Sequence, residues 1–169
     1  ASALYSVPGV SVKGVPLANS LLHLVTGVLH FLLGYAVFRG LDASGVEIGL
    51  FFAVIFSAGH LTQEVRDHDA DRRNGIRTNA VRFGKRPCFV TAFVLFTVAN
   101  ALLVALSMRG AVPSAPALVV VVAYPLHALW TWQVLREGLP FRGVRRLQVR
   151  YRVLYAGIGV AMITSVLLT

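Results

Sequence analysis

Residues 17–38 read LANSLLHLVTGVLHFLLGYAVF, a stretch without Asp, Glu, Lys or Arg. A bilayer core requires about 20 predominantly apolar residues per helix, so this block is long enough to cross a membrane. Four further apolar blocks predict spans over residues 46–65, 87–108, 115–135 and 153–168. Backbone groups in lipid must be hydrogen-bonded internally, which favours helices over open sheets. The sequence therefore predicts an all-α integral membrane bundle of about five transmembrane helices.

The composition agrees with a chain that is solvated by lipid. Of the 169 residues, 56% are hydrophobic and 14% are charged, and the mean hydropathy is +0.70. So few charges could hardly cover the surface of a soluble domain. The net charge of +9 would favour nucleic acid as a partner of a soluble protein. Here the basic residues lie between apolar blocks, so we expect no nucleic-acid partner and a single transmembrane domain over residues 1–169.

Lysine and arginine are distributed unequally between the two sides of the expected bundle. Fourteen of the sixteen basic residues lie in three stretches on one side: Lys13 before the first span, a loop over residues 66–86, and residues 136–152. The opposite side carries Arg39 and Arg109. Cytoplasmic loops of membrane proteins are enriched in Lys and Arg. The basic side, with the loop 66–86, is therefore predicted to face the cytoplasm.

That loop contains the most distinctive polar residues of the chain, in the stretch HLTQEVRDHDADRRNGIRTNAVRFGKR (residues 60–86). If the helix of the second span continues through it, Glu64, Asp67 and Asp71 fall on one face and Asp69 points away. Three carboxylates on one face repel one another, and a divalent cation relieves that repulsion. Mg²⁺ is typically held by one or two carboxylates together with substrate phosphates. The spacing therefore predicts a Mg²⁺ and phosphate site.

The remaining residues of the loop fit this interpretation. Four arginines could contact phosphate oxygens directly: Arg66, Arg72, Arg73 and Arg77. An EF-hand is excluded, because its pattern requires Gly at position 72 and Glu at position 78, where Arg and Thr stand. The segment between Gly75 and Gly84 is expected to pack over the acidic site. The alternative is a solvated loop whose charges only keep it in water.

Residues 64–86, EVRDHDADRRNGIRTNAVRFGKR, resemble the second aspartate-rich motif of the UbiA superfamily of intramembrane prenyltransferases. That motif reads approximately D-x-x-x-D, a few residues, G, then T-x-x-V, a short step and G. The positions in register are Asp67, Asp71, Gly75, Thr78, Val81 and Gly84. Glu64 replaces the Asn of the N-x-x-R-D variants in menaquinone-type members. The opening LYSVPGVSVKG is similar to the stretch after the fourth helix of the family, with Tyr5 and Lys13 at the recurring positions.

The resemblance covers the chain as the C-terminal half of the family's nine-helix fold. The first motif of the family, N-D-x-x-D-x-x-x-D, does not occur in this sequence, although the family uses both motifs to bind the diphosphate from opposite sides. The resemblance therefore implies an incomplete domain. Its N-terminal half would come from missing sequence or from another chain, and this chain alone would be inactive.

The activity that the resemblance implies is transfer of an isoprenyl group, within membrane lipid, from a polyprenyl diphosphate to a lipophilic or aromatic acceptor, as in quinone and other isoprenoid biosynthesis. Mg²⁺ would neutralise the leaving diphosphate. The implied metal ligands are Asp67, Asp71 and Glu64. The implied catalytic residues are Asp67, Asp71 and Lys13. The implied diphosphate-binding residues are Lys13, Arg72, Arg77 and Tyr5.

Two other functions remain open from the residues. A terpene-cyclase-like relative would ionise the same substrate without transferring it to an acceptor. A fragment of a cation transporter or channel would use the acids to bind its ion, and it would carry polar groups deep within several spans. The spans contain few such groups. His23, His30 and His127 are expected to hydrogen-bond between helices, with a metal or proton-relay role as the alternative.

Overall fold

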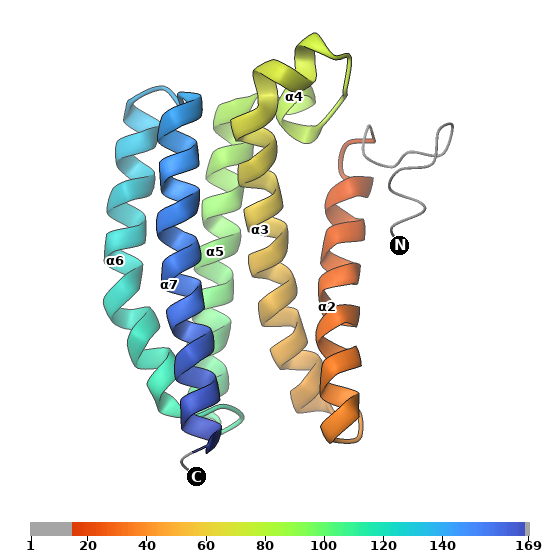
Figure 1. The fold of residues 1–169 in the computed structure, drawn as a ribbon, viewed down its shortest axis with the longest axis vertical. Coiled ribbons are helices and arrows are strands. Elements are labelled where there is room, and N and C mark those ends of the chain that lie inside the picture. The colour runs from red at the N-terminus through yellow and green to blue at the C-terminus, as the bar shows by residue number, and fades with distance from the viewer. Residues whose placement is uncertain (1–14, 168–169) are drawn as a thin grey trace.

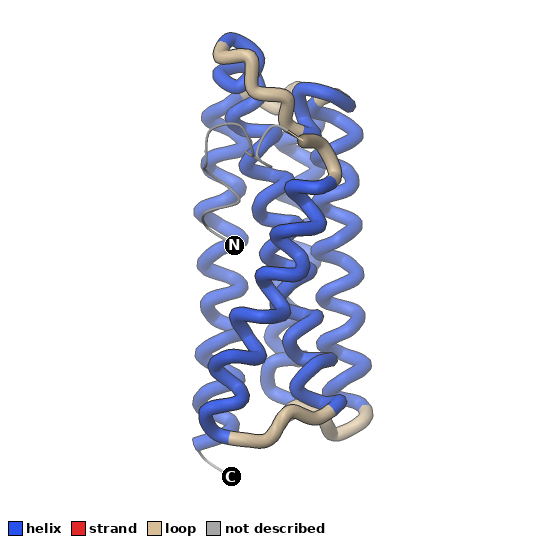
Figure 2. The backbone as a smooth tube through the Cα atoms, turned by 90° about the vertical axis from the view of Figure 1, so that its right-hand side faces the viewer, coloured by secondary structure: helices blue, strands red, loops and turns tan. Residues whose placement is uncertain are grey.

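A computed structural model of the chain describes residues 15–167, and all its regular elements in that range are helices. They are α2 (Ala18–Phe38), α3 (Ala43–Arg73), α4 (Asn79–Phe83), α5 (Lys85–Met108), α6 (Ser114–Arg136) and α7 (Phe141–Leu167). The five long helices run side by side along one axis, and the short α4 lies at one end (Figure 1). The view turned by 90° shows the same arrangement without a strand in the described range (Figure 2). The predicted all-α bundle is confirmed.

Within residues 15–167, four helices are long and apolar enough to cross a membrane: α2, α3, α5 and α6. They contain the first four predicted spans, and α2, α5 and α6 begin and end within two residues of the predictions. The helix α3 differs, because it runs eight residues beyond the predicted end at Val65 and into the predicted loop.

Residues 153–167 of the fifth predicted span, 153–168, lie in α7, which is not among the four. This helix begins twelve residues earlier, at Phe141. Its first half carries five arginines: Arg142, Arg145, Arg146, Arg150 and Arg152. The apolar stretch of α7 therefore begins only after Arg152. Of the five predicted spans, four lie in these candidate helices, and the fifth lies in a helix with a basic first half.

The end of α3 is formed by a glycine turn. Gly75 has a φ of 69°, a conformation that glycine adopts without a steric penalty. The Ile76 amide donates to the Asp71 carbonyl at 2.9 Å and the Gly75 amide donates to the Arg72 carbonyl at 3.3 Å. This pair of bonds is the Schellman motif. The chain then reverses into α4, whose first turn is capped by the Thr78 hydroxyl, an acceptor for the Val81 amide at 3.4 Å.

Close helix contacts fix the position of α2 against α3. A side chain at Gly27 would meet the Ala53 Cα atom at 2.8 Å, so the two backbones approach at this point. Small residues at such crossings are typical of helix packing in lipid. Among the described helices, α2 packs against α3. The helix α3 also contacts α5 and α7, and α6 packs against both α5 and α7. The helix α3 therefore connects α2 to the rest of the bundle.

The basic stretches lie at one end of this bundle. The segment between α3 and α5 and the loop between α6 and α7 are at the top of Figure 1, beside the start of α2. The loops that carry Arg39 and Arg109 are at the opposite end. The predicted separation of the basic residues is therefore confirmed for the described residues, while Lys13 lies outside them.

Candidate functional site

The acidic motif lies on the extension of α3. Because the helix is continuous from Ala43 to Arg73, Glu64, Asp67 and Asp71 lie three and four residues apart on one side of it, as predicted. Their surroundings nevertheless differ. Glu64 is 4% exposed, whereas 31% of the Asp67 side chain is accessible and Asp71 is half-buried.

Glu64 is enclosed by hydrogen-bond partners from three helices. Its Oε1 lies 3.1 Å from Asn19 Nδ2 in α2 and 3.1 Å from His60 Nε2 one turn earlier in α3. Its Oε2 accepts from the Asn79 amide and from Asn79 Nδ2, both at 3.0 Å. A carboxylate has about four acceptor positions, and these partners account for them. The role of Glu64 as a metal ligand stays a prediction, and in the structure this carboxylate joins α2, α3 and α4 through its hydrogen bonds.

Asn79 adds further hydrogen bonds to the contact of α2, α3 and α4 around Glu64, which we call the Glu64 junction. Its Oδ1 accepts from the Leu17 amide at 2.7 Å, and its Nδ2 also contacts the Ser20 hydroxyl at 3.0 Å. Asn79 and the preceding Thr78 are both buried. The segment between Gly75 and Gly84 was predicted to pack over the acidic site. This segment packs over Glu64, and the hydrogen bonds of Asn79 connect the start of α2 to α3.

A histidine pair adjoins this junction. The rings of His23 and His60 stack with centroids 3.6 Å apart and an interplanar angle of 12°. His23 Nδ1 lies 2.8 Å from the Asn19 carbonyl, to which it donates. The sequence prediction included His23 but missed His60. The available signal was the spacing of His60 and Glu64, which places two ionisable side chains one turn apart near the end of an apolar span.

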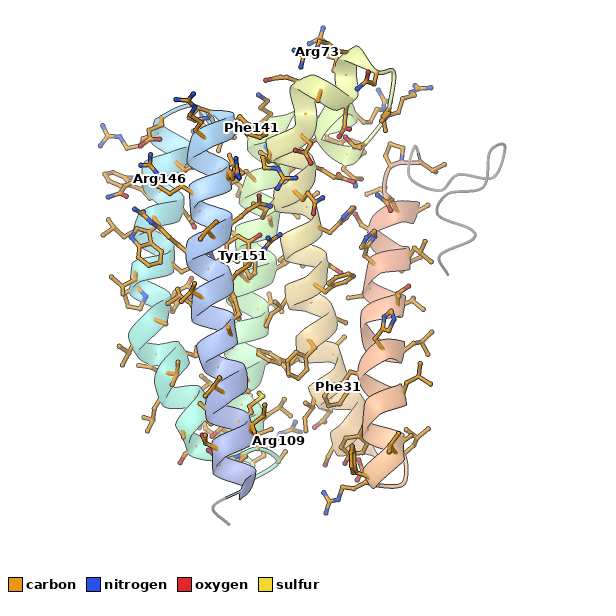
Figure 3. All side chains as sticks on the ribbon, in the orientation of Figure 1. Phe31, Arg73, Arg109, Phe141, Arg146 and Tyr151 are labelled. Carbon is orange, nitrogen blue, oxygen red and sulfur yellow. The ribbon has the colours of Figure 1, made fainter. Side chains whose placement is uncertain are left out.

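Asp67 is held by an arginine of its own helix. Arg66 donates to both carboxylate oxygens, from Nε at 2.7 Å and from Nη2 at 2.6 Å. The third nitrogen, Nη1, donates to Gln148 Oε1 of α7 at 2.9 Å. The adjacent helix α7 also carries Tyr151, labelled in Figure 3, whose ring lies 4.9 Å from that of Phe96 in α5.

The other charged residues of the motif lie at the exposed end of the bundle. Asp69 accepts from Lys85 Nζ at 2.8 Å and lies 2.8 Å from His68 Nδ1, so it belongs to neither of the networks around Glu64 and Asp67, as predicted. Arg72 and Arg77 are exposed. Tyr5 and Lys13 lie outside the described residues.

The donors available for a divalent cation are two carboxylates. Within residues 15–167, no three His, Cys, Asp or Glu side chains are grouped so that they could hold a metal ion. Asp67 and Asp71 are one helical turn apart, and oxygen donors are the ligands that Mg²⁺ prefers. A pair of carboxylates completed by phosphate oxygens and water satisfies that preference, so the donor chemistry fits Mg²⁺ together with a phosphorylated substrate.

An apolar hollow lies along α2 and α3, away from the acids. Its volume is about 550 Å³, and its walls are Gly27, His30, Phe31, Phe52, Ile55 and Phe56. Phe31, labelled in Figure 3, stacks against Phe52 with centroids 5.2 Å apart. Phe56 precedes Asp67 by eleven residues, which is about three turns and roughly 16 Å along an α-helix. Phe56 and Asp67 therefore lie on nearly the same face of α3, and the exposed Gln63 lies between them.

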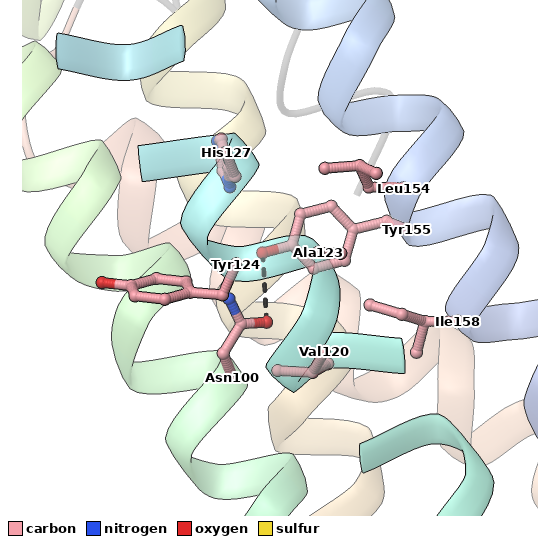
Figure 4. A pocket seen from close by; sticks show the side chains of 8 residues that line it. All are labelled: Asn100, Val120, Ala123, Tyr124, His127, Leu154, Tyr155 and Ile158. Atoms are coloured by element: carbon pink, nitrogen blue, oxygen red, sulfur yellow. Dashed lines mark hydrogen bonds between the residues drawn. The ribbon is translucent and has the colours of Figure 1, made fainter. Parts of the chain in front are cut away.

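A second group of polar residues, which includes Asn100, His127 and Tyr155, lies between α5, α6 and α7 around a small hollow. In Figure 4, Tyr155 donates to Asn100 Oδ1 at 3.3 Å beside His127. The His127 ring lies 4.9 Å from the Phe96 centroid and 5.6 Å from that of Tyr151. The free volume here is about 10 Å³, room for at most one water molecule. The structure places His127 in an aromatic core, apart from the acidic residues.

Comparison with known proteins adds a family assignment. No curated protein and no solved structure matches the chain. A sequence model of the UbiA prenyltransferase family matches residues 1–164, which include the acidic extension of α3 and both walls of the apolar hollow. The chain belongs to the UbiA prenyltransferase family.

Proposed function

We propose that this protein binds a polyprenyl diphosphate through Mg²⁺ at Asp67 and Asp71 and transfers its isoprenyl group to a lipophilic or aromatic acceptor. Membership of the UbiA prenyltransferase family supports prenyl transfer in general. The observation that carries the finer proposal is the face of α3 that bears Phe56 and Asp67 three turns apart. An amphiphile with its diphosphate at Asp67 and its hydrocarbon chain toward Phe56 matches this order of polar and apolar residues.

The polar end of the site would hold the diphosphate. Mg²⁺, when bound, neutralises charge on the leaving diphosphate and so assists rupture of the allylic C–O bond. Asp67 and Asp71 supply the carboxylate oxygens. Arg72, Arg77 and Lys13 are the proposed cationic contacts of the phosphate oxygens, with Tyr5 as a further contact.

The apolar end would hold the hydrocarbon chain at a distance from the reacting carbon. The hollow is mostly apolar in its lining, so it suits the hydrocarbon chain of an isoprenyl substrate. Phe31, Phe52 and Phe56 present aromatic rings along it. The chain's own contribution is therefore a polar end that binds the leaving group and an apolar wall that binds the hydrocarbon chain.

We further propose that a segment carrying the first aspartate-rich motif completes this face of α3, either from preceding sequence or from another chain. The motif would bring carboxylates to the diphosphate from the side opposite Asp67 and Asp71. Without it, we expect this chain to bind the diphosphate weakly and to be inactive in transfer.

We also propose that the acidic end faces the cytoplasm, in agreement with the basic residues at that end. Labelling of single cysteines with a membrane-impermeant thiol reagent tests the orientation. The variants carry Cys88→Ser together with Arg73→Cys at the acidic end or Arg109→Cys at the other. In intact cells, we expect labelling at position 109 and protection at position 73; the reverse pattern would contradict the proposal.

The function is tested by binding of geranylgeranyl diphosphate to the full chain in nanodiscs, with and without Mg²⁺. We expect Mg²⁺-dependent binding that is lost in Asp67→Asn and Asp71→Asn. Asp69→Asn is the matched control, because Asp69 is paired with Lys85 and His68 instead. Equal losses in all three variants, or binding that ignores Mg²⁺, would contradict the assignment. Adding an N-terminal half from a family member then tests whether transfer activity appears.

A further inference from the structure

Asp67 already has a partner at the positions where a metal ion would bind. The guanidinium of Arg66 engages both carboxylate oxygens, at 2.7 Å and 2.6 Å. Such paired contacts match the planar geometry of guanidinium to that of a carboxylate. A cation that coordinates Asp67 in the same plane would have to displace Arg66. The two positive groups therefore compete for the same oxygen atoms.

Arg66 is also held from the opposite side. Its Nη1 donates to Gln148 Oε1 at 2.9 Å, and Gln148 is 1% exposed on α7. Gln148 Nε2 has no hydrogen-bond partner within the described part of the chain. A buried amide is costly when it is not hydrogen-bonded. The amide oxygen of the buried Gln148 side chain is thus hydrogen-bonded, and its partner is Arg66.

We propose that Arg66 neutralises Asp67 while the metal ion is absent and yields Asp67 to the metal when the ion binds. Gln148 is the positioning residue that keeps the displaced guanidinium beside the site, where it faces the diphosphate. This inference rests on the proposed function, because it assumes that Asp67 is a metal ligand. It assigns roles to two residues outside the D-x-x-x-D pattern, one of them on a different helix.

The charges explain why such an exchange is favourable. Asp67 and Asp71 lie one turn apart on α3, and like charges at this spacing repel each other. Arg66 reduces that repulsion in the metal-free state. A divalent cation takes over this role, and the arginine becomes available to phosphate oxygens, which it binds in the same two-point geometry as a carboxylate. Because Nη1 is anchored on Gln148, the guanidinium loses little additional freedom when it changes partners.

Binding of Mn²⁺ to the full chain in nanodiscs, measured by electron paramagnetic resonance without diphosphate, tests the competition. Arg66→Gln removes the competing guanidinium, and we expect Mn²⁺ to bind about three- to fivefold more tightly. Arg73→Gln is the matched control, since it removes one positive charge from the same helix end without a contact to Asp67. Its effect should be less than about twofold, as expected for a screened surface charge.

Gln148 is tested by a nearly isosteric change. Gln148→Glu gives Arg66 a second carboxylate, which draws it away from Asp67, and Mn²⁺ should again bind several-fold more tightly. Gln148→Leu removes the hydrogen bond without adding charge and should change the Mn²⁺ affinity less. A residue with a merely structural role would lower the melting temperature in both variants without raising the Mn²⁺ affinity, and that result would overturn the assignment of Gln148.

The outcomes separate this inference from the proposed function. If the wild type binds Mn²⁺, Asp67→Asn abolishes binding and Arg66→Gln leaves it unchanged or weaker, the competition is refuted and the metal site stands. If Arg66→Gln and Arg73→Gln strengthen binding equally, the effect is one of overall charge and the inference is also refuted. If neither the wild type nor Arg66→Gln binds Mn²⁺ without diphosphate, the ion does not displace Arg66 before the substrate binds and the inference is refuted, while the proposed function is judged separately by Mg²⁺-dependent binding of the diphosphate.

Discussion

Glu64 and Asp67 are two carboxylates on the same helix, less than one turn apart, and they lie in opposite environments. Glu64 is buried among Asn19, His60 and Asn79, and its partners come from three helices. Asp67 is about one-third exposed, and its partner is the preceding residue. The comparison shows that the spacing of acids along a helix does not distinguish a ligand from a structural group. The hydrogen-bond donors that surround each acid do.

The two environments have different consequences for binding. A buried carboxylate with four donors is already stabilised in its charged form and has no free oxygen positions. A partly exposed carboxylate with one arginine can change partners at small cost, because exposed ion pairs contribute at most about 1 kcal/mol. The Glu64 network therefore connects the helices around the candidate site, while Asp67 is the carboxylate that we propose changes its partner.

The largest expected effect concerns the stability of the Glu64 junction. Glu64→Ala would leave the side chains of Asn19, His60 and Asn79 without their shared acceptor in a buried place. Removal of one partner from a buried charged network typically costs 3–5 kcal/mol, and we expect a loss of about 3 kcal/mol in the free energy of unfolding. Titration with SDS from mixed micelles measures this quantity. Asp67→Ala is the control and should change it by less than about 1 kcal/mol.

A milder substitution, Glu64→Gln, tests whether the stability depends on the charge of this carboxylate. Glu64→Gln keeps the shape of the side chain but replaces one oxygen by a donor that would face a donor of Asn79 or Asn19. We expect a loss of stability smaller than that of Glu64→Ala. Equal stabilities of the wild type and both Glu64 variants would show that the junction does not depend on this carboxylate.

The next effect concerns binding and should follow the opposite order. Asp67→Asn and Asp71→Asn each remove a negative charge from the proposed Mg²⁺ site, and we expect each to weaken Mg²⁺-dependent binding of geranylgeranyl diphosphate roughly a hundredfold, or about 2.8 kcal/mol. Isothermal titration in nanodiscs provides the dissociation constants. The unfolding free energy should stay close to that of the wild type, which distinguishes a ligand residue from a structural one.

Most of the fold follows from the sequence, because the apolar blocks reveal the spans. The blocks of α2, α5 and α6 end within two residues of the helices. The extensions of α3 to Arg73 and of α7 back to Phe141 were not predicted as parts of the spans, since hydropathy identifies the lipid-embedded length. Arginine and glutamate are good helix formers, so a helix can continue beyond the apolar block that reveals it.

The candidate site was predictable only in part. The spacing of Glu64, Asp67 and Asp71 placed them on one side of a helix, and α3 confirms that helix. Their partners depend on tertiary contacts that the spacing does not contain: Asn19 is 45 residues from Glu64, and Gln148 is 82 residues from Arg66. The inward direction of Glu64 could therefore not be inferred from the motif alone.

A smaller effect is expected at Asn79, on the α4 side of the Glu64 junction. Asn79→Ala removes the side-chain contacts to Glu64, Leu17 and Ser20 but keeps the backbone amide that donates to Glu64. We expect a loss of about 2 kcal/mol in the unfolding free energy, because hydrogen bonds to charged groups contribute about 1.5–3 kcal/mol. SDS titration again supplies the measurement.

A second substitution at the same position adds a negative charge and serves as the control. Asn79→Asp retains the size of the side chain but places a second carboxylate 3.0 Å from Glu64 Oε2. It should destabilise the protein more than Asn79→Ala at neutral pH. If Asn79→Asp were the milder change, the distribution of charge assigned to the junction would be wrong.

The smallest effect should come from Asp42, the N-cap residue at the other end of α3. Asp42 Oδ1 accepts from the Gly45 amide at 2.7 Å, and the Tyr35 hydroxyl donates to it at 3.0 Å. These bonds, the one from Gly45 foremost, lower the pKa of Asp42 below its ordinary value of 3.8. The charged form therefore stabilises the fold above pH 3.8, and this contribution is lost as the pH falls through the lower folded-state pKa.

Asp42→Ala should accordingly lower the melting temperature slightly at pH 7, and the difference from the wild type should shrink as the solution is acidified below pH 3.8. Asp42→Asn keeps an acceptor for the Gly45 amide, so it should lie between the two and show little dependence on pH in this range. Melting curves in detergent at several pH values measure all three. A difference that grows on acidification would contradict the assigned cap. A difference that shrinks on acidification would support the cap. Asp42 would then resemble Glu64, because the hydrogen-bond donors around each carboxylate determine its structural role.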